Sequence, residues 1–100
     1  MAPINAAEFI SRLKNNEALN LLDVREEIEY ATYNIGGKNV PLSKLPGSIA
    51  LLDYNKTDEI IVICKIGLRS ETARQLLDEN GFRNARNLSG GLIALQKLDQ

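Results

Sequence analysis

Cys64 is the residue of this sequence best suited to act as a nucleophile. It follows the aliphatic run 60–63 and precedes Lys65-Ile66-Gly67-Leu68-Arg69-Ser70, which leads into a helical pattern. Backbone N–H groups at the start of a helix have no partner within the helix, so they are free to hydrogen-bond an anion. Lys65 and Arg69 add two positive charges, and both influences favour a thiolate over a thiol. The segment therefore predicts an anion-binding loop around a reactive sulfur.

A lone cysteine after four aliphatic residues also has a simpler explanation, because free cysteine is often an inert, buried side chain. Neighbouring residues favour a functional thiol instead. Gly67 follows three residues after Cys64, Arg69 follows five residues after it, and a helix begins within the same segment. Open parallel sheets bind their ligands at the carboxyl ends of the strands, where this segment is expected to lie.

The composition limits the size of the fold and its partners. The chain has 100 residues and 44% hydrophobic content, which fits a single domain over 1–100 with one core. Twelve Lys and Arg residues nearly balance thirteen Asp and Glu residues, so we expect no nucleic-acid or membrane partner. Because no segment resembles a bilayer span or a signal peptide, we expect a soluble, cytoplasmic protein.

The cysteine and histidine counts limit the chemistry further. The sequence has one cysteine and no histidine, which excludes an internal disulfide and fits a reducing compartment. A zinc site of the usual ligands, or a Cys-His or Ser-His pair, cannot be built within this chain. We therefore expect no metal and no other cofactor, and chemistry at Cys64 must depend on a thiolate stabilised by its surroundings.

Helical and strand patterns alternate along the chain. The unbroken aliphatic run before Cys64 is typical of a central parallel strand with both faces covered. Alternation of this kind predicts an α/β fold of three layers, with a mostly parallel sheet of four to five strands and helices on both faces. Strands are expected over 19–24, 38–40, 60–64 and 83–88, and helices over 6–14, 26–33, 70–80 and 92–98. Asn5 is expected to cap the first helix, and Gly81-Phe82 has the form of a Schellman ending for the helix over 70–80. Ser43 is expected to cap a weak helical segment that is interrupted by Pro46-Gly47 and resumes over 49–52. Phe9, Tyr30 and Phe82 are expected in the core, and Asp23 and Arg25 in structural ion pairs.

Four stretches of the chain resemble the rhodanese family, in the family's order. One of them is Cys64 to Arg69, which has the family pattern of a cysteine, four residues and an arginine at a strand-to-helix junction. The others are Leu22-Asp23-Val24-Arg25-Glu26 with Glu29-Tyr30, then Asn34 to Leu42, and finally Gly81-Phe82 with Asn87-Leu88-Ser89-Gly90-Gly91. The resemblance covers nearly the whole chain and implies a rhodanese-like fold.

The resemblance implies a sulfurtransferase of the thiosulfate sulfurtransferase type. Cys64 would carry a persulfide, taken from thiosulfate or a protein persulfide and passed to a thiophilic acceptor. The substrate-binding loop would comprise Lys65, Ile66, Gly67, Leu68, Arg69 and Ser70. Arg69 is expected to bind the anionic donor rather than form a salt bridge, because a cation is unfavourable at a helix N-terminus without an anion nearby. Lys65 fits a substrate contact and a solvated surface charge equally well, and Ser70 is expected to be a helix cap.

Proteins that resemble this family can also be phosphatases or non-catalytic docking modules, and the sequence leaves both functions as alternatives. Related phosphatases have five residues between cysteine and arginine, whereas this loop has four, which disfavours phosphate chemistry. A non-catalytic docking module is disfavoured because Cys64, Gly67 and Arg69 are all present.

One segment departs from the family and also suggests a subgroup. The usual Gly-His-Ile reads Tyr33-Asn34-Ile35 here, so a histidine found in many members is missing. The segment 34–38 is nonetheless similar to the rhodanese modules of E1-like adenylyltransferases in molybdopterin and thiamin biosynthesis. That similarity implies sulfur relay to a ubiquitin-like carrier protein.

Overall fold

A parallel four-stranded sheet forms the centre of the computed structural model, which describes residues 1–98. In spatial order the strands are β2 (Lys38–Asn39), β1 (Asn20–Asp23), β3 (Ile60–Ile63) and β4 (Ala85–Asn87). Every neighbouring pair is parallel. The α/β fold predicted from the alternating pattern, with its parallel sheet, is confirmed.

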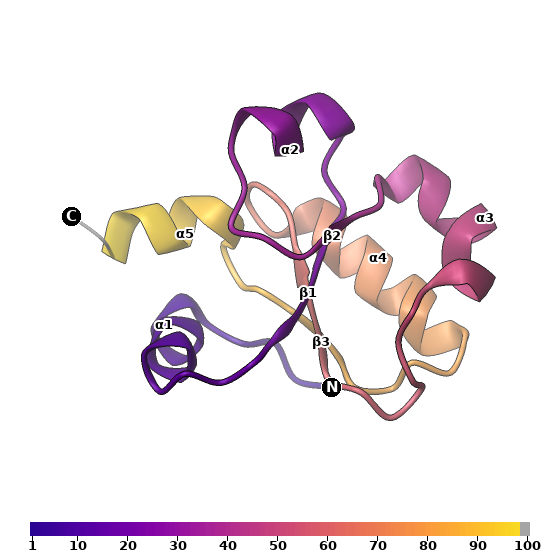
Figure 1. Ribbon diagram of the computed structural model, residues 1–100, viewed down its shortest axis with the longest axis horizontal. Helices are drawn as coiled ribbons and strands as arrows, with labels where there is room; N and C mark the ends of the chain where they lie inside the picture. Colours follow the sequence, from indigo (N-terminus) through magenta and orange to yellow (C-terminus); the bar gives the residue numbers. More distant parts are fainter. Residues whose placement is uncertain (99–100) are drawn as a thin grey trace.

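Helices cover both faces of the sheet (Figure 1). The helices α1 (Ala6–Lys14) and α5 (Gly91–Leu98) contact one another on one face. The short α3 (Leu45–Ser48) and the longer α4 (Leu68–Glu79) lie on the other face, and 3₁₀ turns flank α3 at Leu42–Lys44 and Ile49–Leu51. The helix α2 (Glu27–Thr32) lies beyond the carboxyl end of β1 (Figure 1).

The four residues of β3 are fully buried because they serve two hydrophobic cores. Ile60 and Val62 pack into the core on the α4 side, and Ile61 and Ile63 pack into the core on the α1 and α5 side. Successive side chains of a strand point to opposite faces, so an uninterrupted aliphatic run satisfies both cores at once. Burying each such side chain contributes about 1.5–3 kcal/mol to the stability of the fold. The strand β3 therefore holds the start of the loop that follows it in a fixed position.

Local capping signals act as the sequence predicts. The side chain of Asn5 accepts a 2.8 Å hydrogen bond from the backbone N–H of Glu8 at the start of α1. The helix α4 ends in a Schellman motif, in which the Phe82 N–H donates to the Leu77 carbonyl at 2.9 Å and Gly81 has φ +92°. These contacts fix where α1 begins and where α4 ends.

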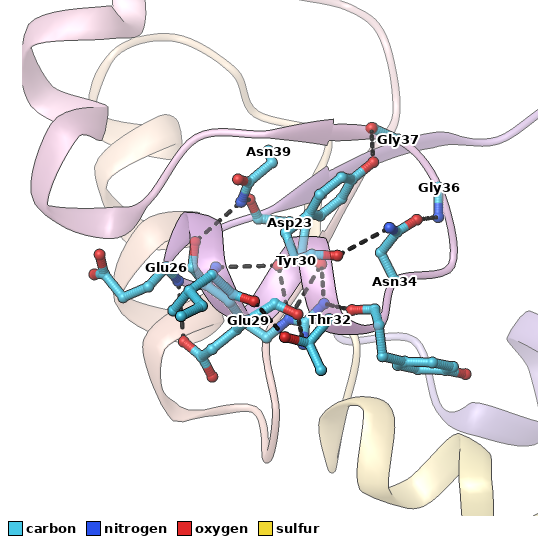
Figure 2. Close-up of polar contacts among 12 residues, drawn as sticks. Asp23, Glu26, Glu29, Tyr30, Thr32, Asn34, Gly36, Gly37 and Asn39 are labelled. Atoms are coloured by element: carbon cyan, nitrogen blue, oxygen red, sulfur yellow. Dashed lines mark hydrogen bonds and ion pairs between the residues drawn. The ribbon is translucent and has the colours of Figure 1, made fainter.

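Three expectations from the sequence are wrong in detail. Pro46 does not interrupt a helix, because it lies in the first turn of α3, where its missing N–H removes no helical hydrogen bond. Ser43 lies inside a 3₁₀ turn rather than capping a helix. Tyr30 is half-buried rather than in the core, because its hydroxyl donates to the Gly37 carbonyl at 2.7 Å (Figure 2).

The carboxyl ends of the strands bring α2 and the loop after β3 to the same end of the molecule (Figure 1). A search of residues 1–98 for a helix with the length and apolarity of a membrane span finds none.

Candidate active site

The loop after β3 makes a tight turn into α4. Gly67 is the N-cap of α4 and has φ +98°, a conformation that side-chain-bearing residues rarely adopt. A Cβ atom there would lie 3.1 Å from the backbone nitrogen of Gly90, so the turn is also close to a second chain segment. The helix therefore begins at Leu68, two residues earlier than predicted, and Ser70 lies in its first turn rather than at its cap.

Three polar groups converge on the sulfur of Cys64. The backbone N–H of Gly67 donates to Sγ at 3.0 Å, and the backbone N–H of Ser70 donates to it at 3.3 Å. The Ser70 hydroxyl lies 3.1 Å from the same sulfur. The Cys64 residue is only 1% exposed, so the thiol is buried within a polar loop rather than under aliphatic side chains alone.

These contacts decide the ionisation of the thiol. Burial raises the pKa of Cys64, but hydrogen bonds from the Ser70 hydroxyl and from the backbone N–H groups of Ser70, Gly67 and Ile66 lower it by more. The net effect is a pKa below the ordinary value for cysteine. A buried thiol without such donors would shift the other way. The loop thus favours the thiolate, as the sequence predicted.

Asn87 holds the loop from the end of β4. The Ser70 hydroxyl donates to Asn87 Oδ1 at 2.5 Å, and Asn87 Nδ2 donates to the Gly67 carbonyl at 3.1 Å. Ser70 and Asn87 are both buried. We assigned no role to Asn87 from the sequence, although a polar residue in a buried strand position is a signal, because such a side chain must find hydrogen-bond partners.

The N-terminus of α5 fixes the start of the loop from another direction. The N–H of Leu92 donates to the Cys64 carbonyl at 3.0 Å, and the N–H of Ile93 donates to the Lys65 carbonyl at 3.1 Å. A Cβ atom at Gly91 would lie 2.5 Å from the Cys64 carbonyl oxygen, so only glycine allows this approach. The first two carbonyl groups of the loop thus accept hydrogen bonds from the first turn of α5.

Arg69 forms an ion pair with Glu29 of α2, which corrects the expectation that it avoids a salt bridge. Nη1 and Nη2 donate to the two carboxylate oxygens of Glu29 at 2.6 Å and 3.0 Å. The pair holds the pKa of Glu29 at about 2, chiefly through the hydrogen bond from Arg69. A carboxylate near the start of α4 supplies the anion that makes a cation tolerable there. Glu29 lies 40 residues away in the sequence, and we gave it no role from the sequence.

The other loop residues lie at the surface. Lys65, Ile66 and Leu68 are exposed, with Ile66 and Leu68 at 53% and 70%. Lys65 and Glu29 border a cavity of about 370 Å³ between α2, the loop and α5. Tyr33 also borders this cavity. A molecule bound there would lie beside the loop.

The buried pair of Asp23 and Arg25 positions α2, and the prediction of a structural ion pair is confirmed. Arg25 Nη2 donates to Asp23 Oδ2 at 2.8 Å and to the Tyr33 carbonyl at 2.6 Å. The Glu29 carboxylate also accepts the Glu26 N–H at 3.0 Å, which closes a capping box at the start of α2 (Figure 2). The helix α2, which carries the Glu29 carboxylate that faces Arg69, is therefore held at both ends.

The arrangement is suited to covalent chemistry on sulfur. Fixed N–H donors around an anionic sulfur stabilise it as an oxyanion hole stabilises an oxyanion. Among residues 1–98 there is no group of three or more Cys, Asp or Glu side chains that would hold a metal ion.

Comparisons with known proteins agree with this geometry. YtwF of Bacillus subtilis (strain 168), which is named a sulfurtransferase, is 34% identical over 92 residues, covering 91% of this chain and 86% of the relative. YrkF of the same organism, which is named a sulfur carrier protein, is 36% identical over 90 residues, covering 89% of this chain. This chain spans about half of YrkF (48%) and a fifth (20%) of the maize adenylyltransferase and sulfurtransferase MOCS3-2, which is 35% identical over 93% of this chain.

Structure and family comparisons give the same result. The human single-domain sulfurtransferase TSTD1 has a similar structure, with a TM-score of 0.83, 28% identity and 95% coverage of both chains. The family model described as the rhodanese-like domain matches residues 5–98. The chain belongs to the rhodanese-like domain family.

Proposed function

We propose that this chain is a sulfurtransferase in which Cys64 carries sulfur as a persulfide. The observation that carries the proposal is the convergence of the Gly67 N–H, the Ser70 N–H and the Ser70 hydroxyl on the Cys64 sulfur. A persulfide carries its negative charge on sulfur, and fixed N–H donors stabilise that charge without reorganisation during the reaction. The family and its named sulfurtransferase relatives support the same chemistry.

The transfer takes place in two covalent steps. The Cys64 thiolate attacks the outer sulfur of the donor and forms a new S–S bond, while the donor's own S–S bond breaks and releases sulfite from thiosulfate or a thiolate from a persulfide. An acceptor then attacks the outer sulfur of the Cys64 persulfide and restores the thiolate. With cyanide as the acceptor the product is thiocyanate, and with a thiol it is a new persulfide.

We propose Lys65 and Arg69 as the cations that an anionic donor meets at the loop, with the backbone of residues 66–68 as the inner surface. Lys65 is exposed and borders the cavity beside the loop. The pKa of Arg69 is raised above its ordinary value, first by the hydrogen bond to Glu29 and also, to a smaller degree, by the charge of Cys64.

We propose that the acceptor is the C-terminus of a ubiquitin-like sulfur carrier in molybdopterin or thiamin biosynthesis. The similarity of this chain to the maize adenylyltransferase and sulfurtransferase MOCS3-2 supports it. The similarity to YrkF, named a sulfur carrier protein, supports a role in sulfur relay more generally.

Intact-mass measurement tests the proposal directly. After incubation with thiosulfate or a small persulfide, the protein should gain the mass of one sulfur atom, and a reductant should remove it. Cys64→Ser should gain none. If neither donor adds sulfur to the folded wild-type protein, a docking module with an idle thiol is the better assignment.

Steady-state kinetics provide the second test. A covalent intermediate predicts ping-pong behaviour, so double-reciprocal plots at several acceptor concentrations should be parallel. Intersecting lines would contradict transfer through Cys64. Hydrolysis of an aryl phosphate that depends on Cys64 would point to the phosphatase chemistry found on this fold.

A further inference from the structure

The positive charge of Arg69, the arginine of the reactive loop, is paired with a carboxylate. Both terminal nitrogens of Arg69 bind the Glu29 carboxylate, at 2.6 Å and 3.0 Å. Bidentate pairing of this kind is the geometry in which arginine also binds oxyanions, so the carboxylate occupies the donors that an oxyanion would use. A dianion entering beside Arg69 meets a guanidinium group whose positive charge the Glu29 carboxylate largely offsets.

This carboxylate is held in place rather than being a mobile surface group. Glu29 also accepts the N–H of Glu26, the N-cap of α2, at 3.0 Å, and Figure 2 shows both residues at the start of that helix. The far end of that helix is bound by Arg25, which donates to the Tyr33 carbonyl at 2.6 Å and pairs with buried Asp23. The Glu29 side chain is 30% exposed and borders the cavity beside the loop, which Lys65 of the loop also borders.

We propose that Glu29 is a specificity-determining residue that disfavours dianionic sulfur donors and favours donors whose sulfur arrives with less charge, such as persulfides. The inference rests on the proposed sulfurtransferase function and adds the class of donor. Glu29 acts by neutralising Arg69 and by repelling a second anion, and both effects grow with the charge of the donor.

The two donor reactions differ in the charge that enters the site. With thiosulfate, the Cys64 thiolate attacks the outer sulfur of a dianion, its S–S bond breaks, and sulfite leaves as a dianion. With a protonated persulfide, the thiolate attacks the S–H sulfur, the proton stays on that sulfur, and one thiolate leaves. A fixed carboxylate at the loop therefore opposes the first reaction more than the second.

The test measures kcat/KM for thiosulfate and for the persulfide of 2-mercaptoethanol, whose carrier is uncharged. Glu29→Gln removes the charge while an amide oxygen can still accept the Glu26 N–H of the capping box. We expect the ratio of thiosulfate to persulfide kcat/KM to rise about tenfold, mainly through a lower KM for thiosulfate. Glu29→Ala should move the ratio in the same direction.

Glu27→Gln is the matched control. It removes the same unit of charge from the same helix, but its partner is the exposed Lys44 rather than Arg69. The control should leave the donor ratio within about twofold of wild type. A second readout needs no turnover: sulfite should protect Cys64 from alkylation at lower concentrations in Glu29→Gln than in Glu27→Gln.

The outcomes separate this inference from the proposed function. If wild type forms the persulfide but Glu29→Gln and Glu27→Gln give the same donor ratio, Glu29 only positions Arg69 and the inference is overturned. Equal loss with both donors in Glu29→Gln would overturn it too. If no donor loads wild-type Cys64, the proposed sulfurtransferase function fails first.

Discussion

Ser70 Oγ lies 2.5 Å from Asn87 Oδ1, and this contact uses the single proton of the Ser70 hydroxyl. The amide of Asn87 is oriented by its second contact, from Nδ2 to the Gly67 carbonyl, so the oxygen must face Ser70. Because Cys64 Sγ lies 3.1 Å from the same hydroxyl, sulfur and amide oxygen compete for that one proton. A protonated thiol can donate to Ser70, whereas a thiolate needs the hydroxyl to donate to it.

Ser70→Ala should raise the pKa of Cys64 because it removes the hydroxyl donor and keeps the backbone N–H. A hydrogen bond to a charged group is worth about 1.5 kcal/mol or more, so alkylation by iodoacetamide at pH 7 should slow roughly tenfold. A pH titration of thiolate absorbance checks the direction. The exposed Ser11→Ala serves as the control, and an unchanged titration in Ser70→Ala would show that the backbone N–H groups suffice.

Asn87→Ala should affect stability more than ionisation. It leaves the buried Gly67 carbonyl without its partner and removes the Asn87 acceptor of the Ser70 hydroxyl, at a cost of about 1–3 kcal/mol in the free energy of unfolding. The pKa of Cys64 should not rise, because the Ser70 proton becomes available to the sulfur. Urea unfolding and thiolate titration measure the two effects. The control is Asn84→Ala, which loses only an exposed contact to the Thr57 carbonyl. A rise in pKa as large as that of Ser70→Ala would contradict the competition for one proton.

Gly67→Ala should destabilise the loop. A side chain at φ +98° costs about 1–2 kcal/mol, and its Cβ would lie 3.1 Å from the Gly90 nitrogen. Urea unfolding should show that loss, and alkylation of Cys64 should slow because the Gly67 N–H moves away from the sulfur. Gly47→Ala is the matched control, since Gly47 lies in a helix with no atom within 4 Å of the added methyl group. Equal stability of the two variants would mean that the turn tolerates a side chain.

Stability should fall in acid partly through Glu29. The pKa of Glu29 is about 2 in the folded protein against an ordinary 4.5, so the ion pair stabilises the fold above pH 4.5. That contribution is lost as the pH falls from about 5 to 2, because the unfolded chain takes up the proton first. The pH dependence of the free energy of unfolding should therefore be flatter in Glu29→Gln, and equally so in Arg69→Ala. Equally steep profiles in wild type and Glu29→Gln would show that the pair adds nothing to stability.

Arg25→Ala should be the most destabilising of these substitutions. Asp23 is fully buried, and Arg25 provides its guanidinium partner. Removing one member of a buried ion pair costs about 3–5 kcal/mol because the other charge is left without a partner. Chemical denaturation measures this loss, with the exposed Arg83→Ala as the control. A difference below about 1 kcal/mol between the two would show that water replaces the lost guanidinium.

Most of the fold follows from local patterns in the sequence. The aliphatic run of β3, the cap at Asn5 and the Gly81-Phe82 ending of α4 each depend on neighbouring residues, and each is confirmed. The sequence predicts that α4 starts at Ser70, because a hydroxyl residue is a favoured N-cap. Gly67 takes that position instead, since only the left-handed turn there brings the N–H groups onto the sulfur.

The parts of the candidate site that the sequence does not predict depend on contacts between distant segments. Arg69 meets Glu29 across 40 residues, and Ser70 meets Asn87 across 17. Neither spacing has a local signature, because both depend on the strand order that places the ends of β1, β3 and β4 together. The loop residues could be identified from type and spacing, whereas the partners that orient them required the folded sheet.

The hydrogen bonds from Leu92 and Ile93 to the carbonyls of Cys64 and Lys65 have a consequence for the order of assembly. The nucleophile lies near the middle of the chain, but the backbone around it is held by residues that a ribosome adds almost thirty positions later. A growing polypeptide that has emerged only as far as Ser70 would expose an ordinary cysteine. The backbone that carries the nucleophile is therefore held in full only after α5 has packed against the loop.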